Sequence, residues 1–346
     1  PATDADVTTL EEMGRRLSRP YHLINANIIL TDSEQARFRG RGGDSFLLSS
    51  LHCGSSATGW YGTEVFNRSY FSREGMTLAT AMAISGAALN PDTGVGGAGV
   101  TRGRAASLLL TFLNLRLGFW APHPRRRRAW FPPNYLTPGL FSGLLGKGLH
   151  EDAPFIQLSD GGHFENLGLY ELVRRRPRVI VLTDAGADPD FQFADLANAM
   201  ERVRADFGTR IEFWLDLDLR GVVADQQVDG LGYPVAPRAY AVANIWYGEE
   251  GADAEGVHPR RPPDGLLLYI KTTLIDGLSV DLVGYKRANP AFPDESTADQ
   301  FFSEPQFEAY RELGFQLTHV MVHQENIAYV AKKRREEPPD GDELEA

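Results

Sequence analysis

This 346-residue chain has little cysteine, and the shortage limits the chemistry open to it. Its one cysteine, Cys53, excludes a disulfide within the chain and a structural zinc site built on Cys-x-x-Cys pairs. Cys53 has no activating partner visible in the sequence, so we interpret it as a small buried residue rather than a nucleophile. The absence of a disulfide framework favours an intracellular, cytoplasmic location.

The chain also lacks an excess of positive charge. It has 35 Lys and Arg residues against 46 Asp and Glu residues, which gives a formal net charge of −11. Non-specific binding to nucleic acid depends on a basic surface that neutralises phosphates, so this balance argues against a nucleic-acid partner.

Long hydrophobic runs are missing as well. The most apolar stretch, Ala105–Trp120, is interrupted by Asn114 and Arg116 and is shorter than the ~20 apolar residues of a membrane span. The first residues, Pro1–Asp6, are small and acidic and do not form a signal peptide. The chain starts without methionine, which fits either a trimmed chain or a piece of a longer protein.

Several catalytic and binding motifs are absent or out of context. No G-x-S-x-G nucleophile motif occurs anywhere, and Ser85, which precedes a glycine, has Ala83 where the motif needs glycine. Gly94–Gly99 matches G-x-G-x-x-G but follows a turn rather than a strand, so we interpret it as a flexible loop.

His319 and His323 have a metal-ligand spacing on a predicted helix. Val320 stands where a zinc protease would have its catalytic Glu, and we therefore interpret both as ordinary helix histidines. We expect no metal and no cofactor.

Along the chain, apolar segments with a strand pattern alternate with segments that have a helix pattern, which predicts the α/β class. The predicted strands are residues 21–30, 44–51, 155–159, 179–183, 211–217, 240–247 and 266–273. The predicted helices are residues 74–88, 104–118, 166–176, 194–207, 304–314 and 319–330. The uninterrupted apolar run over 179–183 predicts a strand of a parallel sheet, buried on both faces. We expect one domain over residues 1–331 with long insertions, then a charged flexible tail over 332–346.

The sharpest local feature is an aspartate that ends a predicted strand and precedes two glycines and a helix. Asp160, Gly161 and Gly162 occupy the position where open α/β sheets build their sites, and glycines let a carboxylate point into a cleft. Such an aspartate could take a proton from a hydroxyl nucleophile or from water. The structural alternative is an Asx turn that only reverses the chain.

A basic cluster stands out against the acidic background. Arg125, Arg126, Arg127 and Arg128 lie close to Trp130, after the apolar stretch. Arginine attracts anionic lipid headgroups and tryptophan prefers the membrane interface, so these residues are candidates for a peripheral membrane contact. A solvated loop is the alternative.

Three segments together resemble the patatin-like phospholipases, in particular the large bacterial branch related to cytosolic phospholipase A. They are AISGAALNP at 83–91, LSDGG at 158–162 and HFENLGLYEL at 163–172, with further similar pieces over residues 20–330. The resemblance implies a three-layer α/β/α fold with a central, mostly parallel sheet.

The same resemblance implies a Ser–Asp dyad that hydrolyses lipid esters, with the aspartate in a DG[AG] motif. That aspartate corresponds to Asp160, with Gly161 and Gly162 completing the motif. The serine elbow and the oxyanion loop would then lie on a segment N-terminal to Pro1, so this chain alone would be inactive. The competing hypothesis is a non-catalytic patatin-fold module that binds lipid or protein.

Overall fold

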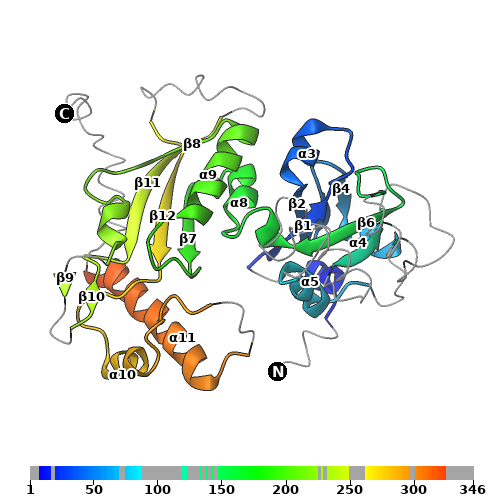
Figure 1. Ribbon diagram of the computed structural model, residues 1–346. Helices are drawn as coiled ribbons and strands as arrows, with labels where there is room; N and C mark the ends of the chain where they lie inside the picture. The colour runs from blue at the N-terminus through cyan, green and yellow to red at the C-terminus, as the bar shows by residue number, and fades with distance from the viewer. Residues whose placement is uncertain are drawn as a thin grey trace. The chain divides into compact units, whose positions relative to one another are not determined.

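The computed structural model describes residues 8–16, 20–69, 75–87, 118–123, 133, 138, 142, 147–224, 227–228, 232–248, 262–296 and 301–324. The chain divides into two compact units, Pro1–Glu171 and Leu172–Ala346, with the division inside helix α8 (Leu169–Arg175). Both units contain strands and helices (Figure 1), which confirms the α/β class. The single domain over 1–331 and the three-layer arrangement stay predictions, and the tail over 332–346 lies outside the described residues.

The first unit is built on a six-stranded sheet with the order β4-β3-β2-β1-β6-β5. Its strands at 21–30, 44–51 and 155–159 were expected from the sequence, and the structure confirms them. The strands are β1 (Leu23–Ile29), β2 (Gly43–Ser49), β3 (His52–Ser55), β4 (Gly59–Gly62), β5 (Phe119–Pro122) and β6 (Phe155–Asp160).

The prediction of a mostly parallel sheet is wrong for the described strands. Every neighbouring pair in the first unit is antiparallel. The reason is partly connection length, because β2 and β3 are separated by Ser50 and Leu51 alone, and a parallel crossover needs a dozen or more residues.

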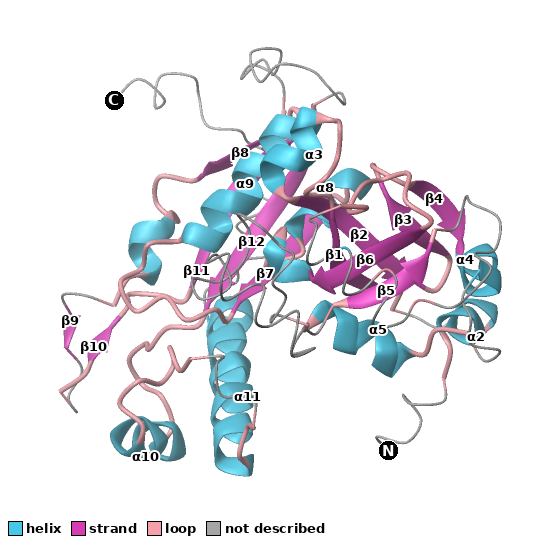
Figure 2. Ribbon diagram, turned by 45° about the vertical axis from the view of Figure 1, so that its right-hand side comes forward, coloured by secondary structure: helices cyan, strands magenta, loops and turns pink. Residues whose placement is uncertain are grey.

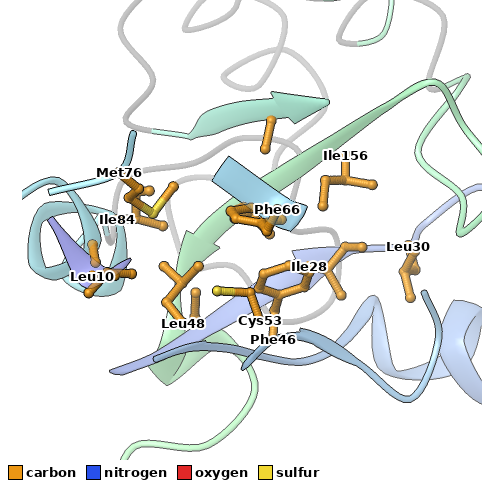
Figure 3. Packing of buried hydrophobic residues seen from close by; sticks show 14 of the residues in the cluster. Leu10, Ile28, Leu30, Phe46, Leu48, Cys53, Phe66, Met76, Ile84 and Ile156 are labelled. Atoms are coloured by element: carbon orange, nitrogen blue, oxygen red, sulfur yellow. The ribbon is translucent and has the colours of Figure 1, made fainter. Parts of the chain in front are cut away.

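Helices cover the face of this sheet that carries its apolar side chains. They are α2 (Leu10–Arg15), α3 (Ala36–Arg41), α4 (Thr63–Ser69) and α5 (Leu78–Ser85). α2 starts at a capping box between Thr9 and Glu12, and the Thr77 hydroxyl caps α5. Side chains from helices and strands meet in one core (Figure 3), which includes Leu10, Ile28, Phe46, Leu48, Phe66, Met76, Ile84, Ile156 and Leu158.

Phe119 and Trp120 follow directly on the helix predicted over residues 104–118. They form β5 and pair with Leu158 and Gln157 of β6. Aromatic side chains suit a half-buried strand, and the pairing with β6 decides their conformation. The preceding predicted helix, residues 104–118, lies outside the described residues except for its last one.

The second unit contains a four-stranded sheet with the order β7-β12-β11-β8. Its strands are β7 (Val179–Asp184), β8 (Arg210–Phe213), β11 (Tyr240–Trp246) and β12 (Gly265–Lys271), and a small separate pair comprises β9 (Gln227–Val228) and β10 (Pro234–Val235). Among the described strand pairs, β7 and β12 alone run parallel. The prediction that β7 is buried on both faces is wrong, because Val179 and Val181 are 49% and 54% exposed.

The helices of the second unit are α9 (Ala194–Phe207), α10 (Val280–Ala288) and α11 (Glu304–His319), with a 3-10 turn η4 (Leu219–Val222). Figure 2 shows α9 running beside the strands of this sheet. The bounds of α9 agree with the sequence prediction. The helix predicted at 304–314 extends to His319 as α11 and continues without a break into a π-helical turn, η6 (Val320–Gln324), at the start of the second predicted helix, 319–330. Residues 325–330 of that prediction lie outside the described residues.

Candidate functional site

Asp160 is the last residue of β6 and lies opposite Ala26 of β1. Because Ala26 belongs to the hydrophobic core, the Asp160 side chain leaves the strand on the core-facing side of the sheet. Its Oδ1 accepts a hydrogen bond of 2.7 Å from the backbone N–H of Gly162. This bond begins the 3-10 turn η3 (Gly161–His163), so the Asx turn considered for this segment is present.

The Asx turn does not use the whole carboxylate. Asp160 is half-buried, and its Oδ2 accepts no hydrogen bond from the part of the chain that the structure describes. One oxygen therefore fixes the orientation of the group while the other is available as a proton acceptor. The structural interpretation and the catalytic one are compatible at this residue.

Close packing requires glycine at position 161, and position 162 is also crowded. A Cβ atom on Gly161 would lie 2.6 Å from the backbone oxygen of Asn25, a separation that real Cβ atoms do not show. A Cβ atom on Gly162 would collide with Oδ1 of Asn166. Glycine lets the turn approach β1 this closely, and that approach sets where Asp160 stands.

The AISGAALNP segment at 83–91, which also carries the family resemblance, contacts the same strand, β1. Ser85, the last residue of α5, donates a hydrogen bond of 2.7 Å from its hydroxyl to the backbone oxygen of Asn25. Asn25 therefore contacts both the ISG segment and the glycine turn. The Ser85 hydroxyl anchors α5 to β1, which gives this serine a structural role.

A second pair of side chains lies beside the glycine turn. The Ser159 hydroxyl is 3.1 Å from Nδ1 of His163, and Nδ2 of Asn27 donates to the same hydroxyl at 3.3 Å. Asn27 and Ser159 are directly opposite each other in the β1–β6 pairing. Sequence reasoning did not select these three residues, although two asparagines alternating through an apolar strand, at 25 and 27, were a usable signal.

A small crevice opens next to the turn, within the first unit. Two buried carboxylates are in its wall, and one of them, Glu171, accepts a hydrogen bond of 3.1 Å from the Ser45 hydroxyl. The other, Glu165, accepts a bond of 3.2 Å from the backbone N–H of Tyr170 and a second one from Leu167. The crevice is lined by Asn25, Ala26, Ser45, Gly161, Phe164, Glu165, Tyr170 and Glu171.

The remaining candidates have structural surroundings or lie outside the described residues. Cys53 is fully buried, and this burial raises the pKa of its thiol, which suppresses the reactive thiolate. The rings of His319 and His323 are 4.5 Å apart, and Phe315 stacks on the first of them. Arg125–Arg128, Trp130 and the glycine-rich segment 94–99 are outside the described residues.

The described residues contain no group of three or more His, Cys, Asp or Glu side chains that could hold a metal ion. No helix in the described ranges is long and apolar enough to cross a membrane.

Comparison with known proteins adds one finding on the fold. No protein-family model and no curated protein matches this sequence. Among solved structures, human GIVD cytosolic phospholipase A2 matches with a TM-score of 0.54 and 15% sequence identity. The fold resembles that of a phospholipase A2. The match covers 95% of this chain and 47% of the human chain, so the chain spans about half the length of that phospholipase.

Proposed function

We propose that this chain is part of a serine acyl hydrolase that cleaves lipid esters, with Asp160 as the acidic member of a Ser–Asp dyad. The observation that carries the proposal is the strand-end aspartate on its close-packed glycine turn, in a fold that resembles a phospholipase A2. The Ser–Asp pairing itself comes from the sequence resemblance to patatin-like enzymes.

In this proposal the nucleophilic serine lies on a segment N-terminal to Pro1, since the chain contains no G-x-S-x-G. The Asp160 carboxylate takes the serine proton as the serine oxygen bonds to the ester carbonyl carbon. Collapse of the tetrahedral intermediate breaks the ester bond, and the departing alkoxide receives that proton. Water then attacks the acyl-serine in the same way and releases the fatty acid.

The hydrogen bonding of Asp160 supports this role. A general base needs a fixed lone pair within reach of the proton that it takes. Holding Oδ1 on the Gly162 N–H prevents rotation of the carboxylate while Oδ2 keeps its lone pairs.

The test is substitution of Asp160 in the full-length enzyme. Asp160→Asn keeps the size of the side chain and an oxygen for the Gly162 N–H, but it removes the base. We expect hydrolysis of a lipid ester to fall by about 10²–10⁴-fold, the usual contribution of a general base. Activity retained within a few-fold would contradict the dyad.

Asp218 provides a matched control. It caps the 3-10 turn η4 through the same geometry, with its Oδ1 accepting from the N–H of Arg220 at 3.0 Å. Asp218→Asn should leave hydrolysis unchanged. Labelling with a fluorophosphonate probe provides a second readout, because a lipid-binding module without a nucleophile would not be labelled.

We further propose that Arg125, Arg126, Arg127 and Arg128, together with Trp130, contact the lipid surface. The net charge of −11 repels anionic headgroups, and each arginine near such a surface contributes about 1 kcal/mol of attraction. Replacing the four arginines with glutamine should weaken binding to anionic vesicles at low salt and leave the far-UV circular dichroism spectrum unchanged. Unchanged vesicle binding would leave the cluster as a solvated loop.

A further inference from the structure

Two consecutive residues of β6 hold the glycine turn from opposite faces of the sheet. Successive side chains of a strand alternate between faces, so Ser159 points away from the core-facing side that Asp160 occupies. On its own face Ser159 is fully buried, and Asn27 beside it is 3% exposed. A buried polar pair in the middle of a sheet costs free energy unless its hydrogen bonds are made.

The hydrogen bonds around Ser159 indicate which group donates and which accepts among Asn27, Ser159 and His163. Asn27 donates from Nδ2 to the Ser159 hydroxyl oxygen. The single hydrogen of that hydroxyl therefore needs an acceptor elsewhere. Among the described residues, Nδ1 of His163 is its one acceptor, at 3.1 Å. A proton on Nδ1 would leave a buried O–H without an acceptor, which folded proteins avoid. We therefore expect His163 to carry its ring proton on Nε2, with Nδ1 as the acceptor.

We propose that Asn27, Ser159 and His163 are positioning residues that clamp the glycine turn onto β6 and so fix the carboxylate of Asp160. The proposal rests on the proposed function of Asp160. It adds a second attachment to the turn, because Gly162 is bonded to Asp160 and His163 to Ser159, two consecutive residues of the same strand.

The need for a second attachment follows from the two glycines. Gly161 and Gly162 carry no side chains, so this part of the turn packs on its neighbours, Asn25 among them, through backbone atoms alone. The Asp160–Gly162 bond attaches the middle residue of the turn to the last residue of β6. The Ser159–His163 bond attaches the last residue of the turn to the preceding residue of the same strand, on the other face of the sheet.

Three variants test the clamp. Ser159→Ala removes the donor to His163. His163→Asn keeps an acceptor oxygen close to the position of Nδ1, whereas His163→Gln moves the acceptor one bond further from the backbone. Ser55→Ala is the control, since it also removes a fully buried hydroxyl from this sheet, one that bonds Thr58 rather than the turn.

In the full-length enzyme, Ser159→Ala and His163→Gln should lower kcat about tenfold, the usual effect of losing one hydrogen bond, and leave KM within twofold. His163→Asn should recover most of kcat, and Ser55→Ala should not change it. A purely structural role would lower the amount of folded enzyme without this split between kcat and KM. Unchanged kcat in Ser159→Ala would overturn the proposal.

The second measurement is nitrogen NMR of the histidine rings in the 346-residue chain, which needs no catalytic activity. The His163 signal is assigned by its loss in His163→Gln, and we expect a protonated Nε2 and a bare Nδ1. Ser159→Ala should abolish this preference. A proton on Nδ1 in the parent chain would refute the clamp, whereas an active Asp160→Asn enzyme with the expected tautomer would refute the dyad alone.

Discussion

Asp160 shares its local geometry with two other aspartates, which differ from it in the partners of their side chains. Asp160, Asp184 and Asp218 each accept a hydrogen bond from the backbone N–H two residues later. Asp184 is buried at the end of β7, where Lys271 lies 3.5 Å from it and Tyr269 donates to it at 2.6 Å. Its charge is compensated inside the protein, which accounts for the burial of this carboxylate.

The close approach of Gly161 to Asn25 leads to a stability prediction. Gly161→Ala should destabilise the first unit by about 1–3 kcal/mol, because its Cβ would overlap a backbone oxygen in a packed sheet. Gly40→Ala, in the exposed α3 with open space around it, should stabilise the unit by about 0.5–1 kcal/mol. Urea unfolding measures both. Equal effects of the two variants would contradict the packing argument.

At the scale of elements, α11 presents apolar residues to two sides. Ala309, Leu313 and Leu317 are buried in a core with residues of α10 and the loops near it. Phe307 and Phe315 are 60% and 59% exposed on the other side of the helix. The sequence predicted helical structure here but did not show which apolar stripe packs against the protein.

This difference in burial predicts unequal losses of stability for two substitutions in the same helix. Leu313→Ala should lower the free energy of unfolding by about 2–5 kcal/mol, because it leaves a cavity in a filled core. Phe315→Ala removes a larger side chain but should change stability by no more than about 0.5 kcal/mol. Thermal unfolding followed by circular dichroism compares them. A large loss in Phe315→Ala would show that its ring is buried in solution.

The relative direction of neighbouring strands was not predicted correctly from the sequence. The positions of β1, β2, β6, β11 and β12 followed from short apolar runs, but those runs have no direction of their own. The two residues between β2 and β3 could have indicated an antiparallel pair, because they are too few for a crossover.

At the scale of the whole molecule, ionisation of tyrosines with raised pKa values limits stability at high pH. Burial, together with the nearby Asp264 carboxylate, raises the pKa of Tyr247 to about 12. Burial and the carboxylate of Glu295, which accepts the Tyr285 hydroxyl at 3.2 Å, raise the pKa of Tyr285 to about 12. Both residues belong to the second unit.

The sign of the pH dependence follows from these raised values. The tyrosines stay protonated in the folded chain above pH 10.0, where they begin to ionise in the unfolded chain. Their contribution to stability is complete below pH 10 and is lost as the pH rises toward 12. Tyr285→Phe should flatten the fall in urea midpoint over this range, and tyrosinate absorbance follows the ionisation. An unchanged slope would exclude Tyr285 as a contributor.

The sequence by itself determined the α/β class, the bounds of α9, most strands, and Asp160 as the leading candidate. These depend on local patterns: hydrophobic period, capping residues and the turn chemistry of aspartate and glycine. Only the tertiary structure decided strand direction, the contact of both signature segments with Asn25, and the hydrogen bonds from Asn27 through Ser159 to His163. Asn27 and Ser159 are 132 residues apart in the chain, and pairing between distant strands brings them together.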